Sequence, residues 1–227
     1  MSESDSKKFL EQLIKDISID VPAPAGGKEP EISLQTREKL FGTEDFSALG
    51  YYAGKEYPDK VIDFTFPSLP NRENIGALAA SFSIFNKKGF TVNEGQGEAV
   101  EIGFPEIDTV FQNFSSKLEP DLAVLGSPHA SAQEFQKIAR MLRGKKVKNS
   151  ITLLVITAEA TRTELELDCF EDDIKKAGGI VVTEASTPLQ KSFNCTLTNS
   201  SLAAHRALEC GMDSKLASLG DIIKAVA

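Results

Sequence analysis

Four short polar segments in this 227-residue chain carry side chains that could do chemistry; three of them follow a short apolar run, and the fourth precedes an apolar helical run. They are Gly126-Ser127-Pro128-His129, Thr157, Thr183-Glu184-Ala185-Ser186 and Thr198-Asn199-Ser200-Ser201. Together they offer hydroxyls, one carboxylate, one imidazole and backbone N–H donors, which suits binding of a small anionic molecule. His129 could exchange a proton with such a ligand, because histidine titrates near neutral pH.

A structural interpretation of the same residues stays open. Ser, Thr and Asn side chains cap helices in many α/β proteins, and residues 198–201 precede a run of apolar residues with helical character. His129 could equally be a surface residue of a turn, and His205 is expected to pack or to face solvent. Neither histidine has a partner at metal-ligand spacing, so no metal site is predicted.

The elements that must position these segments are predicted from hydrophobic periodicity. The expected strands are residues 61–66, 122–125, 151–156 and 180–182, and the expected helices are residues 71–85, residues 107–118 and a helix that begins after Ser131. Glu134, three residues after Ser131, completes the sequence pattern of a capping box. Alternating strands and helices predict an α/β fold, a doubly wound, mainly parallel sheet with helices on both faces.

The carboxyl ends of parallel strands meet at one edge of a sheet, where helix N-termini also converge. We therefore expect the four polar segments to line one cavity with a positive potential. The residues predicted to contribute are Ser127, His129, Ser186, Thr198, Asn199 and Ser200.

The first forty residues differ from the rest. Residues 9–17 have apolar side chains at helical spacing and predict a short amphipathic helix, and residues 21–30 contain three prolines and a Gly-Gly pair typical of a linker. Residues 1–40 are thus predicted to be a helix and linker, and residues 41–227 one compact α/β domain. Within that domain residues 91–103 are expected to form a loop with a short strand near residues 100–102.

Bulk composition excludes several classes of function. The chain is 41% hydrophobic and 26% charged, as in ordinary globular proteins, and its net charge of −8 disfavours nucleic acid as a partner. No apolar run is long enough to cross a membrane, and the first eight residues are polar with no signal-peptide pattern behind them. Three irregularly spaced cysteines predict buried thiols in a reducing compartment, so a cytoplasmic location is expected.

A further set of motifs carries a family resemblance. Gly126-Ser127-Pro128-His129-Ala130-Ser131, then Leu142-Arg143-Gly144, then Thr198-Asn199-Ser200 with Ala203-Ala204-His205, resemble the ordered motifs that close the large subunit of the aconitase X family. Leu49-Gly50-Tyr51-Tyr52-Ala53-Gly54 and residues 85–91 are similar to preceding segments of that family. The resemblance runs from about residue 49 to the C-terminus.

The resemblance implies a dehydratase fold, with substrates such as phosphomevalonate or cis-3-hydroxyproline and an iron–sulfur cluster held by three cysteines. It also implies that Ser127 and Ser186 stand where the family has cluster cysteines, that Asn86 and Leu202 replace a family histidine and lysine, and that the third cysteine belongs to a region absent from this sequence. Because hydroxyls are poor ligands for such clusters, we expect no cofactor here.

Two functions follow as expectations. The first is an aconitase-X-like dehydratase, a hydro-lyase domain or subunit without its own cluster, which binds a small hydroxy acid or a phosphorylated hydroxy acid. In that case Ser127, His129 and Ser186 would be catalytic, Thr198, Asn199 and Ser200 would bind the substrate, and partner chains would supply the missing N-terminal half and a swivelling domain. The second is a catalytically inactive interaction or regulatory protein on the same scaffold.

Overall fold

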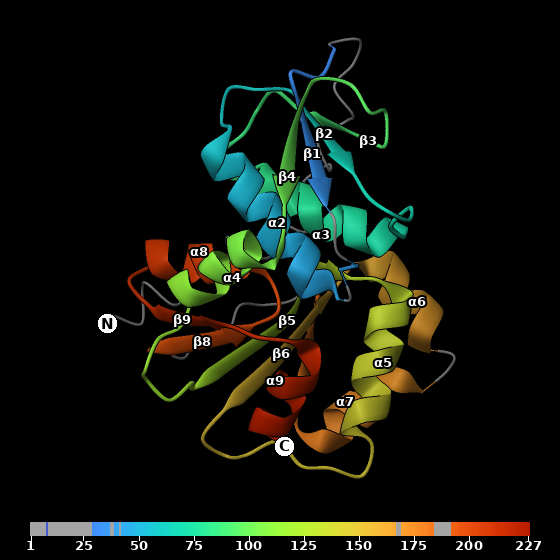
Figure 1. Ribbon diagram of the computed structural model, residues 1–227. Coiled ribbons are helices and arrows are strands. Elements are labelled where there is room, and N and C mark those ends of the chain that lie inside the picture. The colour runs from blue at the N-terminus through green and yellow to red at the C-terminus, as the bar shows by residue number, and fades with distance from the viewer. Residues whose placement is uncertain (1–7, 9–28, 37–38, 41, 167–168, 184–191) are drawn as a thin grey trace. The chain divides into compact units, whose positions relative to one another are not determined.

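The computed structural model describes residues 8, 29–36, 39–40, 42–166, 169–183 and 192–227 (Figure 1). The chain divides into two compact units, with the boundary in the described region between Asn113 and Phe114. We call them the N-terminal unit and the C-terminal unit, and each is built on its own parallel sheet. The predicted helix of residues 9–17 and most of the predicted linker lie outside the described residues.

The N-terminal unit is a four-stranded parallel sheet with the order β3-β2-β1-β4. Its elements are β1 (Ile32–Thr36), α2 (Thr43–Glu56), β2 (Ile62–Thr65), α3 (Arg72–Phe82), β3 (Phe90–Val92), β4 (Glu98–Ile102) and α4 (Phe104–Asn113). Three phenylalanines, Phe64, Phe82 and Phe90, meet edge to face with ring centroids 5.7 Å apart. This aromatic cluster lies in the core between the sheet and helices α2 and α3.

A buried carboxylate holds the loop that follows β3. Asp63 is fully buried in β2, and it accepts hydrogen bonds from the hydroxyls of Thr65 and Thr91 and from the backbone N–H groups of Glu94 and Gly95. Four donors satisfy the carboxylate, as a buried anion requires. The strand predicted near residues 100–102 is confirmed as β4, which follows this loop.

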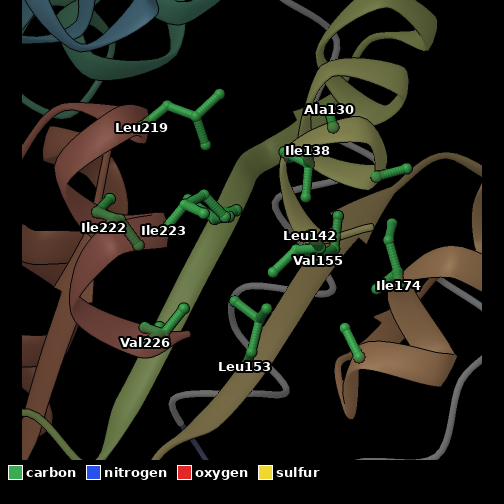
Figure 2. Close-up of a cluster of buried hydrophobic side chains, with 14 of the residues drawn as sticks. Ala130, Ile138, Leu142, Leu153, Val155, Ile174, Leu219, Ile222, Ile223 and Val226 are labelled. Carbon is green, nitrogen blue, oxygen red and sulfur yellow. The ribbon is translucent and has the colours of Figure 1, made fainter. Parts of the chain in front are cut away.

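The C-terminal unit is a five-stranded parallel sheet with the order β7-β6-β5-β8-β9. Its elements are β5 (Leu122–Ala130), α5 (Ala132–Leu142), β6 (Thr152–Thr157), α6 (Glu159–Glu166), α7 (Phe170–Ala177), β7 (Ile180–Val182), β8 (Cys195–Thr198), α8 (Ser201–Glu209), β9 (Asp213–Leu216) and α9 (Leu219–Val226). Side chains of α5, α7 and α9 cover one face, as Figure 2 shows for Ile138, Ile174 and Ile223. Helix α8 covers the other face with Ala203 and Ala207.

The sheet of the C-terminal unit changes its direction of winding at β5. From β5 the chain proceeds through β6 to β7 on one side, and then returns to place β8 and β9 on the other side of β5. Adjacent strands β5 and β8 are therefore followed by helices on opposite faces of the sheet. Such a switch point leaves a crevice outside the carboxyl ends of the two strands.

Most predicted elements are confirmed, and the α/β fold with parallel sheets and flanking helices is as expected. The prediction of one sheet is wrong: the strand at residues 61–66 belongs to the N-terminal unit, so the predicted domain of residues 41–227 is divided. Strand β1 also begins before residue 41. The alternation of strands and helices predicts that strands pair in parallel. It does not predict which strands share a sheet, because strand order depends on contacts between distant parts of the chain.

One helix differs in its bounds. Helix α4 begins at Phe104 and ends at Asn113, whereas residues 107–118 were predicted. The chain leaves the helix because Phe114 and Ser116 form backbone hydrogen bonds with strand β9, and Ser115 makes an antiparallel bridge to Lys215. These bonds cover the edge of β9, which would otherwise present unpaired backbone groups.

Candidate functional site

The candidate site lies at the carboxyl ends of β5 and β8, the switch point of the C-terminal sheet. Val124 of β5 pairs with Thr198 of β8, so the segments that follow these residues leave the sheet side by side. Those segments are two of the four predicted from the sequence, residues 126–129 and residues 198–201. The structure therefore places Ser127, His129, Thr198, Asn199 and Ser200 at the same edge of the sheet, whereas Ser186 lies outside the described residues.

Residues 126–129 form an outward bulge of β5. Leu125 pairs with Val155 of β6 and Ala130 pairs with Thr157, so five steps along β5 match two steps along β6. Gly126 turns the chain with φ of +77°, and a Cβ there would lie 2.5 Å from the carbonyl oxygen of Ile156. Only glycine fits this position without strain.

The bulge carries a buried hydroxyl and an exposed imidazole. Ser127 is 8% exposed, and its Oγ has no hydrogen-bond partner among the residues that the structure describes. His129, two residues later, is exposed. An unsatisfied buried hydroxyl is rare in native proteins and points to a group that is bound there from outside the described chain. The bulge thus offers one hydrogen-bonding group and one titratable group at the same edge.

The segment after β8 is held mainly by its own hydrogen bonds. Thr198 is fully buried, and its Oγ1 accepts a hydrogen bond from the Ser200 backbone N–H at 3.2 Å. The Ser200 Oγ accepts one from the Ala203 N–H at 3.4 Å, which makes Ser200 the N-cap of α8. Capping therefore accounts for the hydroxyl of Ser200, as the structural interpretation of the sequence allowed.

Asn199 is joined to a carboxylate on the other side of the switch point. Its Nδ2 donates to Glu134 Oε1 at 2.8 Å, and both residues are buried, at 4% and 7% exposure. The sequence placed Glu134 only in a capping box, and half of that box is confirmed because Ser131 Oγ accepts from the Glu134 N–H at 3.1 Å. The contact with Asn199 spans 65 positions of sequence and had no local signal.

From the other two predicted segments the structure describes Thr157 and Thr183, which lie on the β6 and β7 side of β5, whereas residues 184–186 lie outside the described residues. Thr157, at the end of β6, is fully buried and donates from its Oγ1 to the carbonyl oxygen of Ala130 at 3.2 Å. Thr183, just after β7, is also buried. Of these residues Thr157 adjoins the bulge directly.

None of the described cysteines lies in the segments that follow β5 and β8. Cys195 begins β8 and so lies at the opposite, amino end of that strand, Cys210 follows the end of α8, and Cys169 is exposed before α7. Burial raises the pKa of the Cys195 thiol, which keeps it protonated. Across the described residues no three His, Cys, Asp or Glu side chains are grouped as a metal site requires. The described donor set at the switch point consists of hydroxyl, amide, imidazole and carboxylate groups; it holds no thiolate and does not fit an iron–sulfur cluster.

A cleft of about 650 Å³ lies elsewhere in the C-terminal unit, beside α9. We call it the α9 cleft; its lining includes Asp121, Lys148, Leu197, Lys215 and Asp221. Asp121 precedes β5 and Lys148 precedes β6, so much of the cleft belongs to the amino ends of these strands. It shares no residue with the candidate site.

Within the described ranges, no helix has both the length and the apolar character that crossing a membrane demands.

Comparison with known proteins identifies relatives over most of the chain. Residues 120–227 match the family model described as the aconitase X third domain. The phosphomevalonate dehydratase large subunit of Methanosarcina mazei is 29% identical over 201 residues, which cover 82% of this chain and 49% of that protein. The protein of the same name from Methanothermobacter thermautotrophicus is 29% identical over 182 residues, covering 70% of this chain and 45% of that protein.

A solved structure agrees in fold. The crystal structure of Thermococcus kodakaraensis aconitase X in its holo-form matches with a TM-score of 0.78 and 21% identity, covering 88% of this chain and 55% of that chain. The chain spans about half the length of the relatives it matches.

Proposed function

We propose that the C-terminal unit, of which residues 120–227 match the aconitase X third domain, binds a small hydroxy acid, plain or phosphorylated, at the switch point between β5 and β8, as part of a dehydratase. The observation that carries the proposal is Ser127, whose buried Oγ has no partner within the described part of the chain. An oxygen of the ligand would supply that partner.

The neighbouring groups suit such a ligand. The N–H groups at the start of α5 and α8 carry the positive ends of the helix dipoles, which favour an anion. His129 is exposed at the same bulge and can give or take a proton. Dehydration removes a hydroxyl and a proton from adjacent carbons, so one titrating side chain beside a bound hydroxy acid is the contribution expected of this unit. We propose that the hydroxyls of Ser127 and Ser186 are catalytic together with His129, as hydrogen-bonding groups for the substrate.

The relatives are named large subunits, and this chain spans about half of their length. We propose that partner chains supply the remaining half and a swivelling domain, and that the active hydro-lyase is the assembly in the cytoplasm. We also propose that the chain binds no iron–sulfur cluster. The support is the donor set, because Ser127 offers a hard hydroxyl and none of the described cysteines lies in the segments that follow β5 and β8.

A second function has one specific observation in its favour. Asn199 and Ser200 already make internal contacts, one with Glu134 and one with the Ala203 N–H. Such contacts are what an inactive interaction or regulatory protein would keep if it used the scaffold alone. The unpartnered hydroxyl of Ser127 favours the first function.

Thermal-shift measurements with glycolate and 2-phosphoglycolate test the proposal. At a concentration of about a hundred times its dissociation constant, a ligand stabilises the fold by roughly 2.7 kcal/mol. We expect a rise in melting temperature for the wild type that is smaller in Ser127→Ala and in His129→Ala. The matched control is His205→Ala, which removes the other histidine from the middle of α8 and should behave as the wild type. Equal shifts in all four proteins, or none, would favour the inactive scaffold.

A further inference from the structure

We propose that Glu134 is a positioning residue that couples the two halves of the candidate site through Asn199. This inference rests on the proposed function of the same site. Glu134 takes part in the cap of helix α5 through its backbone N–H. We assign its side chain a second role, which is to hold the segment after β8 at a fixed distance from the bulge of β5.

The topology creates the need for such a contact. Three of the four adjacent strand pairs in this sheet, β5–β6, β6–β7 and β8–β9, are consecutive in the chain and are joined by a connection that contains a helix. Strands β5 and β8 are adjacent but are not joined in this way. At the switch point α5 packs on one face and α8 on the other, so neither helix spans the gap between the two loops. Side chains that reach across the gap must set the distance between them.

The contact is anchored at both ends. Glu134 is fixed at the third position of α5, because its backbone N–H is bonded to the Ser131 Oγ. Asn199 lies between Thr198, whose carbonyl oxygen accepts from the Ala217 N–H at 3.0 Å, and Ser200, the N-cap of α8. A hydrogen bond of 2.8 Å between two buried, anchored side chains therefore links the two loops rigidly.

The chemistry of the pair makes the link strong. A carboxylate accepting from an amide is a charge-assisted hydrogen bond, and burial keeps water from competing for either group. The amide nitrogen of Asn199 is thereby used within the protein. Asn199 acts on a ligand through the position of its loop and not through this N–H group.

Amide hydrogen exchange and probe binding together test the inference. The reporters are the Ser200 and Ala203 N–H groups, which are bonded to Thr198 Oγ1 and Ser200 Oγ and need no ligand. We expect Glu134→Ala to speed exchange at both amides and to weaken 2-phosphoglycolate binding by about tenfold, the scale of outer supporting contacts. Asn71→Ala, which removes the side-chain cap of α3 in the N-terminal unit, should lower stability and leave both readouts as in the wild type.

A reversed pair separates the contact from simple damage. Asn199→Asp alone places two carboxylates together and should act as Glu134→Ala does, whereas Asn199→Asp with Glu134→Gln restores a carboxylate and an amide in exchanged places. We expect the double variant to recover slow exchange and probe affinity. Unchanged exchange in Glu134→Ala, or no recovery in the reversed pair, would overturn the inference. If the wild type binds no probe, the proposed function fails, and normal exchange in Glu134→Ala would exclude the positioning role independently.

Discussion

Gly50 of α2 lies so close to the backbone of Leu78 in α3 that a Cβ on Gly50 would come within 2.1 Å of the Leu78 carbonyl oxygen. Four residues later Gly54 meets the carbonyl oxygen of Phe82 in the same way, at 2.5 Å, and the hydroxyls of Ser47 and Ser81 are hydrogen-bonded at 2.7 Å. These small residues let the two helices of the N-terminal unit pack backbone to backbone.

Replacing Gly50 by alanine should therefore destabilise the protein. The added methyl group must displace backbone atoms, and overpacking of this kind costs about 1–3 kcal/mol. Gly76→Ala is the matched control, since a Cβ on Gly76 of α3 would meet no neighbouring atom within 4 Å, and alanine favours a helix by up to about 1 kcal/mol. Urea denaturation monitored by circular dichroism measures both. A Gly50→Ala variant as stable as Gly76→Ala would contradict the close contact.

The hydroxyl of Thr196 gives the opposite expectation. Thr196 of β8 is fully buried, and its Oγ1 has no hydrogen-bond partner in the described part of the chain. Thr196→Val should raise the free energy of unfolding by up to about 1 kcal/mol, because it removes an unpaired buried polar atom. Thr157→Val makes the same change where the hydroxyl donates to the Ala130 carbonyl oxygen, and should lower it by about 1 kcal/mol.

Thermal denaturation measures the stability of both variants. An equal loss of stability in Thr196→Val and in Thr157→Val would show that the Thr196 hydroxyl has a hydrogen-bond partner. A bound water would be the simplest candidate.

Glu171 should make stability depend on pH. Burial favours its neutral form, but hydrogen bonds from Arg162 at 3.0 Å and Lys175 at 2.5 Å outweigh burial and hold the pKa of Glu171 below its ordinary value. A lowered folded-state pKa adds stability above the unfolded-state pKa, and this contribution is lost as the pH falls through the folded-state pKa. Glu171→Gln should therefore melt below the wild type at about pH 7 and approach it towards about pH 3.

Asp172→Asn is the control for this titration, because Asp172 is an exposed neighbour on α7 whose contact with Lys176 is 3.8 Å long. Its melting temperature should follow that of the wild type across the same pH range, since exposed ion pairs contribute little. A constant difference between Glu171→Gln and the wild type at every pH would mean that the Glu171 charge is not what stabilises α7.

Anaerobic reconstitution with iron and sulfide tests the proposal that no cluster binds. We expect no stoichiometric iron and no absorption in the charge-transfer region after desalting, because a hydroxyl stands at position 127 and soft thiolates are required. A full-length aconitase X treated in parallel shows whether the procedure works. Stoichiometric iron and sulfide in this chain would contradict the proposal.

The elements of the fold were largely predictable, and the reason is local. Strand β6 and helix α5 follow from hydrophobic periodicity within a dozen residues, and the N-cap at Ser131 follows from its spacing to Glu134. The number of sheets was not predictable in this way. Strand β2 is, like β6, a short strand between two helices, yet it pairs in a different sheet, because pairing depends on contacts far along the chain.

The candidate site was predictable to the same extent. The rule that polar residues after parallel strands share an edge predicted that residues 126–129 and 198–201 lie at one edge, and the parallel pairing of β5 with β8 agrees with that placement. The binding of a ligand by these residues stays a prediction. The partner of Asn199 was not predictable, since Glu134 is 65 positions away and its local pattern already had an explanation. The sequence alone does not distinguish the hydroxyl of Ser200, which caps a helix, from the hydroxyl of Ser127, which has no partner among the described residues; the hydrogen bonds of the structure distinguish them.

Backbone NMR shifts during a titration with 2-phosphoglycolate test the central claim most directly, because they locate a ligand without assuming an activity. We predict that the largest changes fall on residues 126–131 and 198–203, the two loops of the switch point, and that Ser127→Ala reduces them. Changes that fall instead on the α9 cleft, or an unchanged spectrum at millimolar ligand, would contradict the assignment of this edge as the binding site.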